Sequence, residues 1–306
     1  MKQNRSSLTA AGIAIVRALE SEKPAGERVC YDPYARRFVN AGLYYLVKFF
    51  AALGYADWRG PGVWEFLTAR ERYIDDYLES CLREGLEQLV ILGAGYDARA
   101  YRFDALKSGV KVFEVDHPAT QAVKLKKLAA IFGARPAHVT YVPIDFNQQT
   151  AAEPLFESGY EARCRTLFIW QGVTQYLTPA AVDDTLAFVA ERAGPGSSVI
   201  FDYMDATLLA GAPRHGEVSN MRRYRRLSGE GLVFGIPIDS IQTFMEERGF
   251  TQVKNADHVA LEKAYFRTGS RLHQVADGYA IVSARASASP ASNIAASFPA
   301  TRRGSW

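Results

Sequence analysis

The sequence predicts an α/β protein in which a mostly parallel β-sheet is covered by helices on both faces. From about residue 85 onward, short apolar runs alternate with longer amphipathic runs, which is the pattern of strands connected by helices. The first apolar run ends in a Gly-x-Gly turn and the second ends at an acid, which adds a ligand-binding signal to the same pattern. With 306 residues, 48% of them apolar, the chain can bury a large core of this kind.

Residues 1–84 are predicted to form a helical cap region ahead of the sheet. Residues 8–19 are rich in alanine and carry apolar residues at helical spacing. Residues 32–38 begin with Asp-Pro, which is typical of a helix start because Asp caps the first backbone N–H groups and Pro suits the first turn. Residues 64–82 show a further amphipathic pattern.

Six strands and five helices are predicted in the domain that spans residues 85–285. The strand candidates are residues 88–92, 110–115, 138–143, 165–170, 198–203 and 278–284. The helix candidates are residues 97–107, 118–131, 150–157, 179–193 and 238–248. Because helical runs separate the strands, successive strands should lie parallel in one sheet.

Two segments are expected to lie outside this alternation. Residues 204–236 interrupt the last unit and are predicted to be an inserted helical lid, which contains the densest basic stretch of the chain at residues 221–226. That stretch fits a solvated helix face, a site for an acidic acceptor, or a contact with RNA phosphates. Residues 286–306 are rich in Ser, Ala and Pro, a composition typical of a disordered tail.

Composition and spacing argue against several other classes of protein. The net charge of +3 is too small to indicate nucleic-acid binding by itself. No run of about 18 apolar residues predicts a membrane span, and the polar N-terminus lacks the apolar core of a signal peptide. The three cysteines and five histidines show no metal-ligand spacing. We therefore expect a cytoplasmic protein with reduced thiols and no metal.

The glycine turn directly follows the first strand candidate. Gly93 and Gly95 flank Ala94, and glycines at such a turn let the backbone approach a ligand closely. The second apolar run stops at Asp116, about 20 residues further on, where a carboxylate can accept hydrogen bonds from both hydroxyls of a ribose. Together these residues predict a site for a nucleoside cofactor.

Further motifs accompany the glycine turn in a fixed order. Residues 70–76 read Arg-x-Arg-x-Ile-Asp-Asp, the third strand candidate is followed by Asp145 and Phe146, and the fourth by Gln171 in Gln-Gly-Val-Thr-x-Tyr-Leu. With Leu-Gly-Ala-Gly-x-Asp-x-Arg and Glu-Val-Asp-His-Pro between them, these motifs resemble those of the class I S-adenosylmethionine-dependent methyltransferases. Within that class the chain is similar to the leucine carboxyl methyltransferase family, and in particular to its bacterial branch.

The resemblance extends over about residues 6–284 and implies a Rossmann-like, seven-stranded sheet with S-adenosylmethionine as the cofactor. It implies that Arg70 pairs with the methionine carboxylate, for which the two parallel donors of a guanidinium are suited. It places Gly93 and Gly95 beneath the methionine moiety and Asp116 at the ribose.

The resemblance also assigns the adenine and ammonium contacts. Asp145 would accept from the exocyclic amine of adenine, and Phe146 would cover the ring. Gln171 stands where the family usually has Glu, which accepts from the ammonium of the cofactor. An amide oxygen can accept a hydrogen bond but supplies no charge, so we expect Gln171→Glu to tighten cofactor binding or leave it unchanged.

For the reaction, the resemblance implies methyl transfer to an oxygen of a small-molecule acceptor, either a carboxylate or a hydroxyl, with an acidic acceptor among the candidates. A carboxylate is ionised at neutral pH and needs no general base, which agrees with the lack of a catalytic histidine motif. No catalytic residue is assigned; Gln175 and Tyr176 after the fourth strand and Tyr203 in the fifth are candidates for orienting the acceptor. The sequence indicates no oligomeric state.

Two alternatives compete with this interpretation. Residues 93–98 also fit G-x-G-x-x-A of an NAD-dependent dehydrogenase, but that motif usually opens its domain, and Asp97 would lie where a pyrophosphate binds. A non-catalytic RNA-binding or regulatory protein on the same fold is favoured by the basic stretch and by Gln171. It is disfavoured because Asp116 and the glycines are intact.

Overall fold

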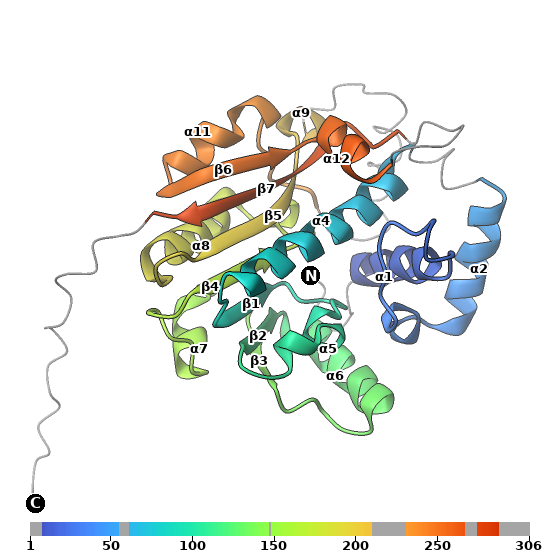
Figure 1. The fold of residues 1–306 in the computed structure, drawn as a ribbon, viewed down its shortest axis with the longest axis horizontal. Helices are drawn as coiled ribbons and strands as arrows, with labels where there is room; N and C mark the ends of the chain where they lie inside the picture. Colours follow the sequence, from blue (N-terminus) through green and yellow to red (C-terminus); the bar gives the residue numbers. More distant parts are fainter. Residues whose placement is uncertain (1–7, 55–60, 147, 210–230, 267–273, 288–306) are drawn as a thin grey trace, which may run out of the picture.

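The computed structural model describes residues 8–54, 61–146, 148–209, 231–266 and 274–287. A seven-stranded sheet crosses the molecule with helices on both of its faces (Figure 1). The N-terminal helices α1 (Leu8–Ser21) and α2 (Ala41–Ala52) lie beside the sheet, at the right of this view. The fold is therefore the predicted α/β class.

The sheet has the strand order β3-β2-β1-β4-β5-β7-β6. Its strands are β1 (Gln88–Leu92), β2 (Lys111–Asp116), β3 (Val139–Pro143), β4 (Thr166–Trp170), β5 (Ser198–Met204), β6 (Phe250–Ala256) and β7 (Tyr279–Ala286). The first five strands pair in parallel, while β7 runs antiparallel to both β5 and β6. The carboxyl ends of β1 to β4 consequently meet along one edge, where ligands bind in open α/β sheets.

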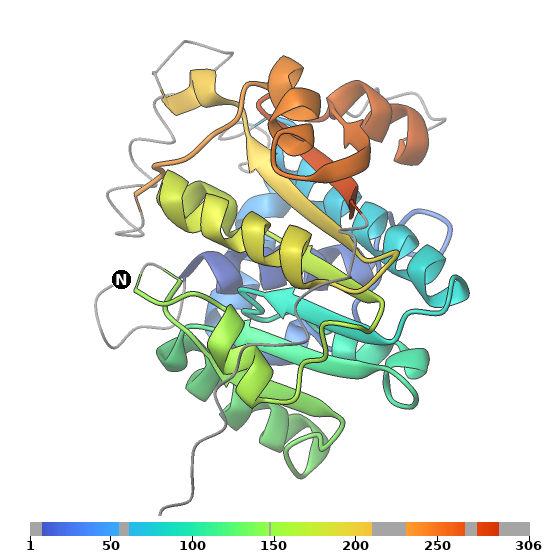
Figure 2. The same ribbon diagram turned by 90° about the vertical axis from the view of Figure 1, so that its left-hand side faces the viewer.

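The helices occupy two layers, with α4 on one face of the sheet and α8 on the other (Figure 2). The longer ones are α4 (Val63–Arg83), α6 (Pro118–Phe132), α8 (Pro179–Arg192) and α12 (His258–Tyr265). The shorter ones are η1 (Ala35–Phe38), α5 (Arg99–Arg102), η2 (Asp104–Leu106), α7 (Ala152–Glu157), η3 (Thr174–Tyr176), α9 (Ala206–Leu209), η4 (Ile238–Ser240) and α11 (Ile241–Glu246).

Each face of the sheet has its own apolar core. Side chains of α1, α4, α6 and α12 pack on one face, and those of α7, α8 and α11 pack on the other. All five residues of β1 and all five of β4 are buried, as expected for central parallel strands covered on both sides. The cap region therefore shares the core of the first face.

Local sequence sets several of the helix ends. The Thr178 hydroxyl accepts from the Ala181 backbone N–H at 3.2 Å, and Pro179 occupies the first turn of α8. Asp32 accepts from the backbone N–H of Tyr34 and of Ala35, as the predicted cap should. The helix that follows is one short 3-10 turn, η1.

The strand candidates from the sequence correspond to six of the seven strands, and β6 is the one missed. Only the first and last residues of β6 are buried, so no alternating apolar pattern marks it. Among the described strands it forms the edge of the sheet and pairs with β7 alone, and its register is irregular between Thr251 and Lys254.

Two other predictions need correction, and one helix of the cap region was missed. The predicted helix over 97–107 is divided into α5 and η2, because Phe103 adopts an extended backbone between them. The helix predicted over 238–248 begins as the 3-10 turn η4 and becomes α-helical only from Ile241 to Glu246. Helix α2 was not singled out within the cap region, although Asn40 caps it by accepting from the Leu43 N–H.

Most of the predicted lid and tail lies outside the described residues. Of residues 204–236, only 204–209 and 231–236 are described, and the basic stretch 221–226 falls in the gap between them. Of the tail, 288–306 are likewise outside. Among the described helices, none is long and apolar enough to cross a membrane.

Candidate functional site

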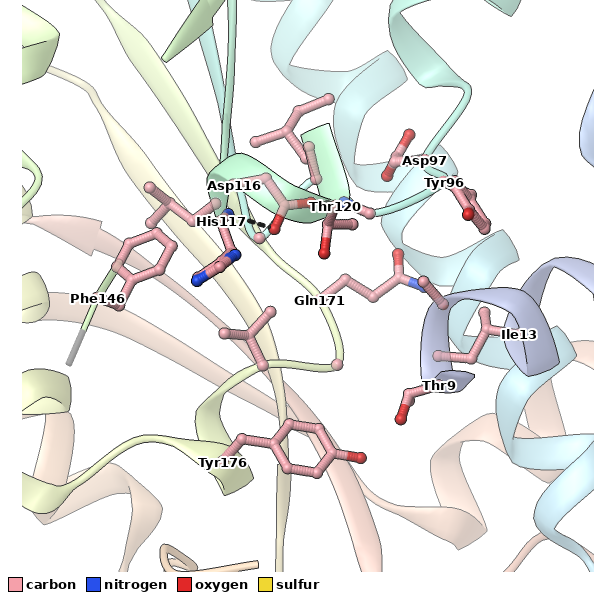
Figure 3. Close-up of a pocket in the computed structure, with 18 of the residues that line it drawn as sticks. Thr9, Ile13, Tyr96, Asp97, Asp116, His117, Thr120, Phe146, Gln171 and Tyr176 are labelled. Carbon is pink, nitrogen blue, oxygen red and sulfur yellow. Dashed lines mark hydrogen bonds between the residues drawn. The ribbon is translucent and has the colours of Figure 1, made fainter. Parts of the chain in front are cut away.

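A cavity of about 260 Å³ opens at the carboxyl ends of β1 to β4 (Figure 3). Its walls come from the ends of the four strands, from the turns that follow them, from helix α1 and from Gly231. The strand ends and turns contribute residues 91–97 at β1, Asp116, His117 and Thr120 at β2, Ile144, Asp145 and Phe146 at β3, and Gln171, Gly172, Val173, Tyr176 and Leu177 at β4. Helix α1 contributes Thr9, Ala10, Ile13 and Arg17. The cavity is thus built from strand ends that lie far apart in the sequence.

The glycine turn forms the floor of this cavity. Gly93 has φ +68°, and a Cβ there would lie 2.3 Å from the Cγ2 of Val173. Gly95 has φ +42°, and a Cβ there would lie 3.3 Å from the Cβ of Ala10 on α1. Both glycines are therefore required by backbone conformation and by close packing, as predicted for a turn beneath a ligand.

Asp116 stands at the end of β2 with its carboxylate at the cavity. It accepts from the backbone N–H of Gly95 and from that of His117, each at 2.6 Å. Burial raises the pKa of Asp116, and these two hydrogen bonds act in the opposite direction. The carboxylate is thus fixed against the glycine turn and has lone pairs left for a ligand.

Asp145 and Phe146 follow β3 on the same side of the cavity. The Asp145 carboxylate lies 3.8 Å from the Nε2 of His117. The Phe146 ring and the His117 ring both border the cavity in Figure 3. These three side chains form a partly exposed pocket between the ends of β2 and β3.

Gln171, after β4, connects the cavity to a buried ionic network. Its amide oxygen accepts from Nη1 of Arg99 at 2.8 Å, and its amide nitrogen donates to Oε1 of Glu71 at 2.6 Å. Arg99 Nη2 in turn donates to Oε2 of Glu71 at 2.6 Å. Burial alone would raise the pKa of Glu71, but the guanidiniums of Arg99 and Arg17 outweigh it and hold the pKa below its usual range.

Helix α1 closes one side of the cavity with Thr9, Ile13 and Arg17, which lie at four-residue spacing on one helix face. Arg17 donates to Glu71 Oε1 at 3.1 Å, pairs with Asp32 at 3.1 Å, and donates to the carbonyl oxygen of Tyr96. No motif in the sequence predicts a role for these residues. The signal that could have indicated a role was the position of Arg17, a charged residue on the apolar face of a helix.

Arg70 is buried beside the cavity but is not part of its lining. Its Nη1 donates to Asp202 Oδ2 at 2.6 Å, and the other oxygen of Asp202 accepts from the Gly172 N–H at 2.6 Å. A Cβ on Gly172 would lie 3.4 Å from Arg70 Nη1, so the guanidinium sits directly behind that glycine. The Nε and Nη2 of Arg70 are buried without a hydrogen-bond partner among the described residues.

Of the three candidates for orienting an acceptor, only Tyr176 lines the cavity, with its hydroxyl directed toward α1 (Figure 3). Gln175 lies outside the lining. The prediction that Tyr203 orients an acceptor needs correction, because this residue is 1% exposed and its hydroxyl donates to Asn255 on β6. Because successive side chains of a strand point to opposite faces, Tyr203 packs in the core under α8 and α11, away from the cavity.

A second buried pair supports the glycine turn from below. Lys124 of α6 and Glu114 of β2 are each 1% exposed and are joined by an Nζ–Oε2 contact of 2.7 Å. Lys124 Nζ also lies 3.4 Å from the carbonyl oxygen of Ala94, and Glu114 accepts from the hydroxyl of Tyr101. Fold and cavity together define an α/β protein with a cavity at the carboxyl edge of its sheet, the edge at which open α/β sheets bind ligands.

Comparison with known proteins identifies the family. The leucine carboxyl methyltransferase family model matches residues 10–190. A Mycobacterium avium (strain 104) protein named "Putative S-adenosyl-L-methionine-dependent methyltransferase" is 32% identical over 255 residues, which cover 79% of this chain and 82% of the relative. The chain therefore belongs to the leucine carboxyl methyltransferase family.

Other relatives match over a shorter stretch. The Bacillus subtilis (strain 168) "Putative S-adenosyl-L-methionine-dependent methyltransferase YktD" is 34% identical over 181 residues, which cover 59% of each chain. A relative from Rhodococcus jostii (strain RHA1) with the same description is 36% identical over 199 residues, or 64% of this chain and 65% of the relative. The chain thus spans less than two thirds of the length of these two relatives.

Solved structures show the same fold at low sequence identity. The crystal structure titled "putative methyltransferase from Thermobifida fusca YX" has a TM-score of 0.58 at 13% identity and covers 92% of this chain and 96% of its own. The crystal structure titled "a duf574 family protein from Streptomyces avermitilis MA-4680" has a TM-score of 0.55 at 13% identity, over 92% of this chain and 97% of its own. The solved structures confirm the predicted fold class. The family match confirms the predicted family and decides against the dehydrogenase.

Proposed function

We propose that this protein is an S-adenosylmethionine-dependent methyltransferase that methylates an oxygen of a small-molecule acceptor. The class of enzyme follows from the family and from the names that its relatives carry. The observation that supports the cofactor most directly is the partly buried carboxylate of Asp116, fixed against the glycine turn at the end of β2. A pair of ribose hydroxyls can donate to such a carboxylate.

The residues around the cavity fit the rest of this cofactor. Asp145 and Phe146 would meet the adenine from the end of β3, and Gly93 and Gly95 leave room for the methionine chain. The unpartnered Nε and Nη2 of Arg70 are the kind of orphaned buried donors that an added carboxylate would satisfy. We keep Arg70 as the proposed partner of the methionine carboxylate, reached beside Gly172.

Methyl transfer requires the protein chiefly to align the acceptor with the methyl group of the cofactor. When bound, S-adenosylmethionine supplies an electrophilic methyl group with a neutral thioether as leaving group. The chain must therefore hold the acceptor oxygen in line and exclude water, for which the α1 wall and the segment 173–177 after β4 are placed. We assign Tyr176 the orienting of the acceptor, because its hydroxyl points across the opening toward α1 (Figure 3).

The acceptor end of the cavity favours a molecule with an apolar body. Ile13, Val173 and Leu177 line it, with the hydroxyl groups of Thr9 and Tyr176 as polar points. An acceptor carboxylate is already ionised at neutral pH, and an alcohol would need a base to remove its proton. A screen of paired carboxylic acids and alcohols on the same apolar body would distinguish the two groups.

The cofactor assignment is tested by calorimetric titration with S-adenosylmethionine and, in parallel, with NAD. We expect micromolar binding of S-adenosylmethionine alone, and a loss of at least tenfold in affinity for Asp116→Ala. Asp104→Ala is the matched control, because the exposed carboxylate of Asp104 pairs with Lys107 and does not line the cavity. Binding of NAD, or an unchanged affinity in Asp116→Ala, would refute the assignment.

A further inference from the structure

The buried network behind Gln171 carries an unequal number of charges. Its contacts join Arg17, Arg99 and Arg102 with the carboxylates of Asp32, Glu71, Asp75 and Asp97. Three guanidiniums against four carboxylates leave one surplus negative charge among the described residues of the network. A buried surplus charge is costly unless a partner of opposite sign compensates it.

The surplus charge lies next to the cavity, beside two side chains that line it. Asp97 borders the cavity and shares Arg99 with Glu71. Gln171 also borders the cavity, and it contacts Glu71 directly through its amide nitrogen. A cation in this part of the cavity would therefore complete the network.

Gln171 is the neutral member that makes this arrangement stable. Its amide donates to Glu71 and accepts from Arg99, so one side chain satisfies an acid and a base at the same time. A carboxylate at position 171 would instead lie against Oε1 of Glu71. Two carboxylates in contact cannot both stay ionised, and one of them would take up a proton.

We propose that Glu71, bridged to the cavity by Gln171, provides the negative charge that faces the cationic methionine end of the cofactor. The inference rests on the proposed function. Gln171 and Glu71 form one hydrogen-bonded pair that carries a single negative charge. In this chain the charge belongs to Glu71 on α4, and the residue at the end of β4 is neutral. Glu71 is in this sense a positioning residue, because it acts on the ligand through Gln171, to which it is hydrogen-bonded.

This arrangement narrows the expectation drawn from the sequence for Gln171→Glu. The added carboxyl would share a proton with Glu71, so the network gains little charge, and we expect affinity within threefold of the wild type, with a lower melting temperature. Two variants are decisive. Glu71→Gln removes the negative charge from the pair. The double variant Glu71→Gln/Gln171→Glu, called the swap below, keeps one negative charge in the pair but moves it to position 171.

The experiment compares two ligands by calorimetry. S-adenosylmethionine carries the sulfonium and the amino-acid end, whereas methylthioadenosine has the same adenosine with a neutral thioether and lacks the sulfonium charge, the ammonium and the carboxylate. For Glu71→Gln we expect at least a tenfold loss of S-adenosylmethionine affinity and less than a twofold change for methylthioadenosine. The swap should restore S-adenosylmethionine affinity to within about threefold of the wild type. Asp75→Asn is the charge-matched comparison: it removes one carboxylate from the same network at a position that contacts Arg99 and Arg102 away from the cavity, so it should weaken S-adenosylmethionine binding less than Glu71→Gln does.

Three outcomes would overturn the inference: equal losses for the two ligands in Glu71→Gln, no recovery in the swap, or an equal effect of Asp75→Asn. If Glu71→Gln does not fold, the swap variant tests the inference by itself. It should then show the same ratio of S-adenosylmethionine affinity to methylthioadenosine affinity as the wild type. Failure of the proposed function would look different, since the wild type itself would not bind S-adenosylmethionine.

Discussion

At Asp116, the ionised carboxylate has opposite effects on the stability of the fold and on the proposed binding of a ribose. Burial raises its folded pKa above the ordinary value of 3.8, so the ionised form is disfavoured in the folded protein. Above the raised pKa the charge therefore destabilises the fold, and protonation on acidification relieves this cost. A ribose, by contrast, needs the ionised form, because charge-assisted hydrogen bonds are about twice as strong as neutral ones.

The two effects predict opposite pH dependences. As the pH falls through the raised pKa, S-adenosylmethionine affinity should decrease by roughly tenfold, because two hydrogen bonds lose their charge assistance. Over the interval from the raised pKa down to 3.8, the stability of the wild type should rise relative to Asp116→Asn. Calorimetric titrations and urea unfolding between pH 4 and 8 measure both. An affinity difference between the two proteins that is constant with pH would contradict the prediction.

Among the elements, the turn after β1 has the strictest requirements. Gly93 needs a positive φ and also has the Val173 side chain within 2.3 Å of where a Cβ would stand. Gly109 has a similar φ of +87° but nothing within 4 Å of such a Cβ. Substituting Gly109 therefore measures the free-energy cost of backbone strain alone, whereas substituting Gly93 measures that cost together with the cost of a steric clash.

We expect Gly109→Ala to destabilise the protein by about 1–2 kcal/mol, the typical cost of the left-handed conformation. Gly93→Ala should cost at least about 1 kcal/mol more, since the neighbouring Val173 must also move. Only Gly93→Ala should weaken S-adenosylmethionine binding, because only that turn lies at the cavity. Adding Val173→Ala should recover the clash part alone. Urea unfolding and calorimetry give both quantities, and equal costs at the two glycines would argue against the close packing.

At the scale of the whole molecule, the site depends on α1 docking onto the carboxyl edge of the sheet. Ala10 packs against Gly95, and Arg17 reaches the Tyr96 carbonyl oxygen and Glu71. Helix α1 is held mainly by these contacts and by the core on its face of the sheet. A ligand in the cavity would touch α1 and the strand ends at once, and should stabilise their association.

Hydrogen exchange tests this coupling. At a cofactor concentration one hundred times the dissociation constant, openings that release the ligand become about 2.7 kcal/mol more costly. Amide exchange in residues 9–17 of α1 should therefore slow by up to about a hundredfold. The local exchange of β6, at the far edge of the sheet, should change little. Equal slowing in both segments, or none in α1, would show that α1 does not close on the ligand.

Sequence alone determined the class of fold, because strand and helix patterns are local. The apolar runs of β1 and β4 and the capped start of α8 are readable without knowing their neighbours. Edge strand β6 was not readable, since its side chains are mostly exposed and it is held by backbone pairing with β7. The family, too, was predicted from ordered motifs and was then confirmed by comparison.

Tertiary structure decided how the site residues are connected. Gly93, Gly95, Asp116, Asp145, Phe146 and Gln171 line one cavity because parallel strands bring their carboxyl ends to one edge. Which residue faces the cavity depends on strand alternation and helix packing, so Tyr203 points away and Arg17 points in. The pairing of Gln171 with Glu71 spans 100 positions of sequence. Such a contact exists only once α4 packs on the sheet, because the physical cause is proximity in the fold and no local pattern encodes it.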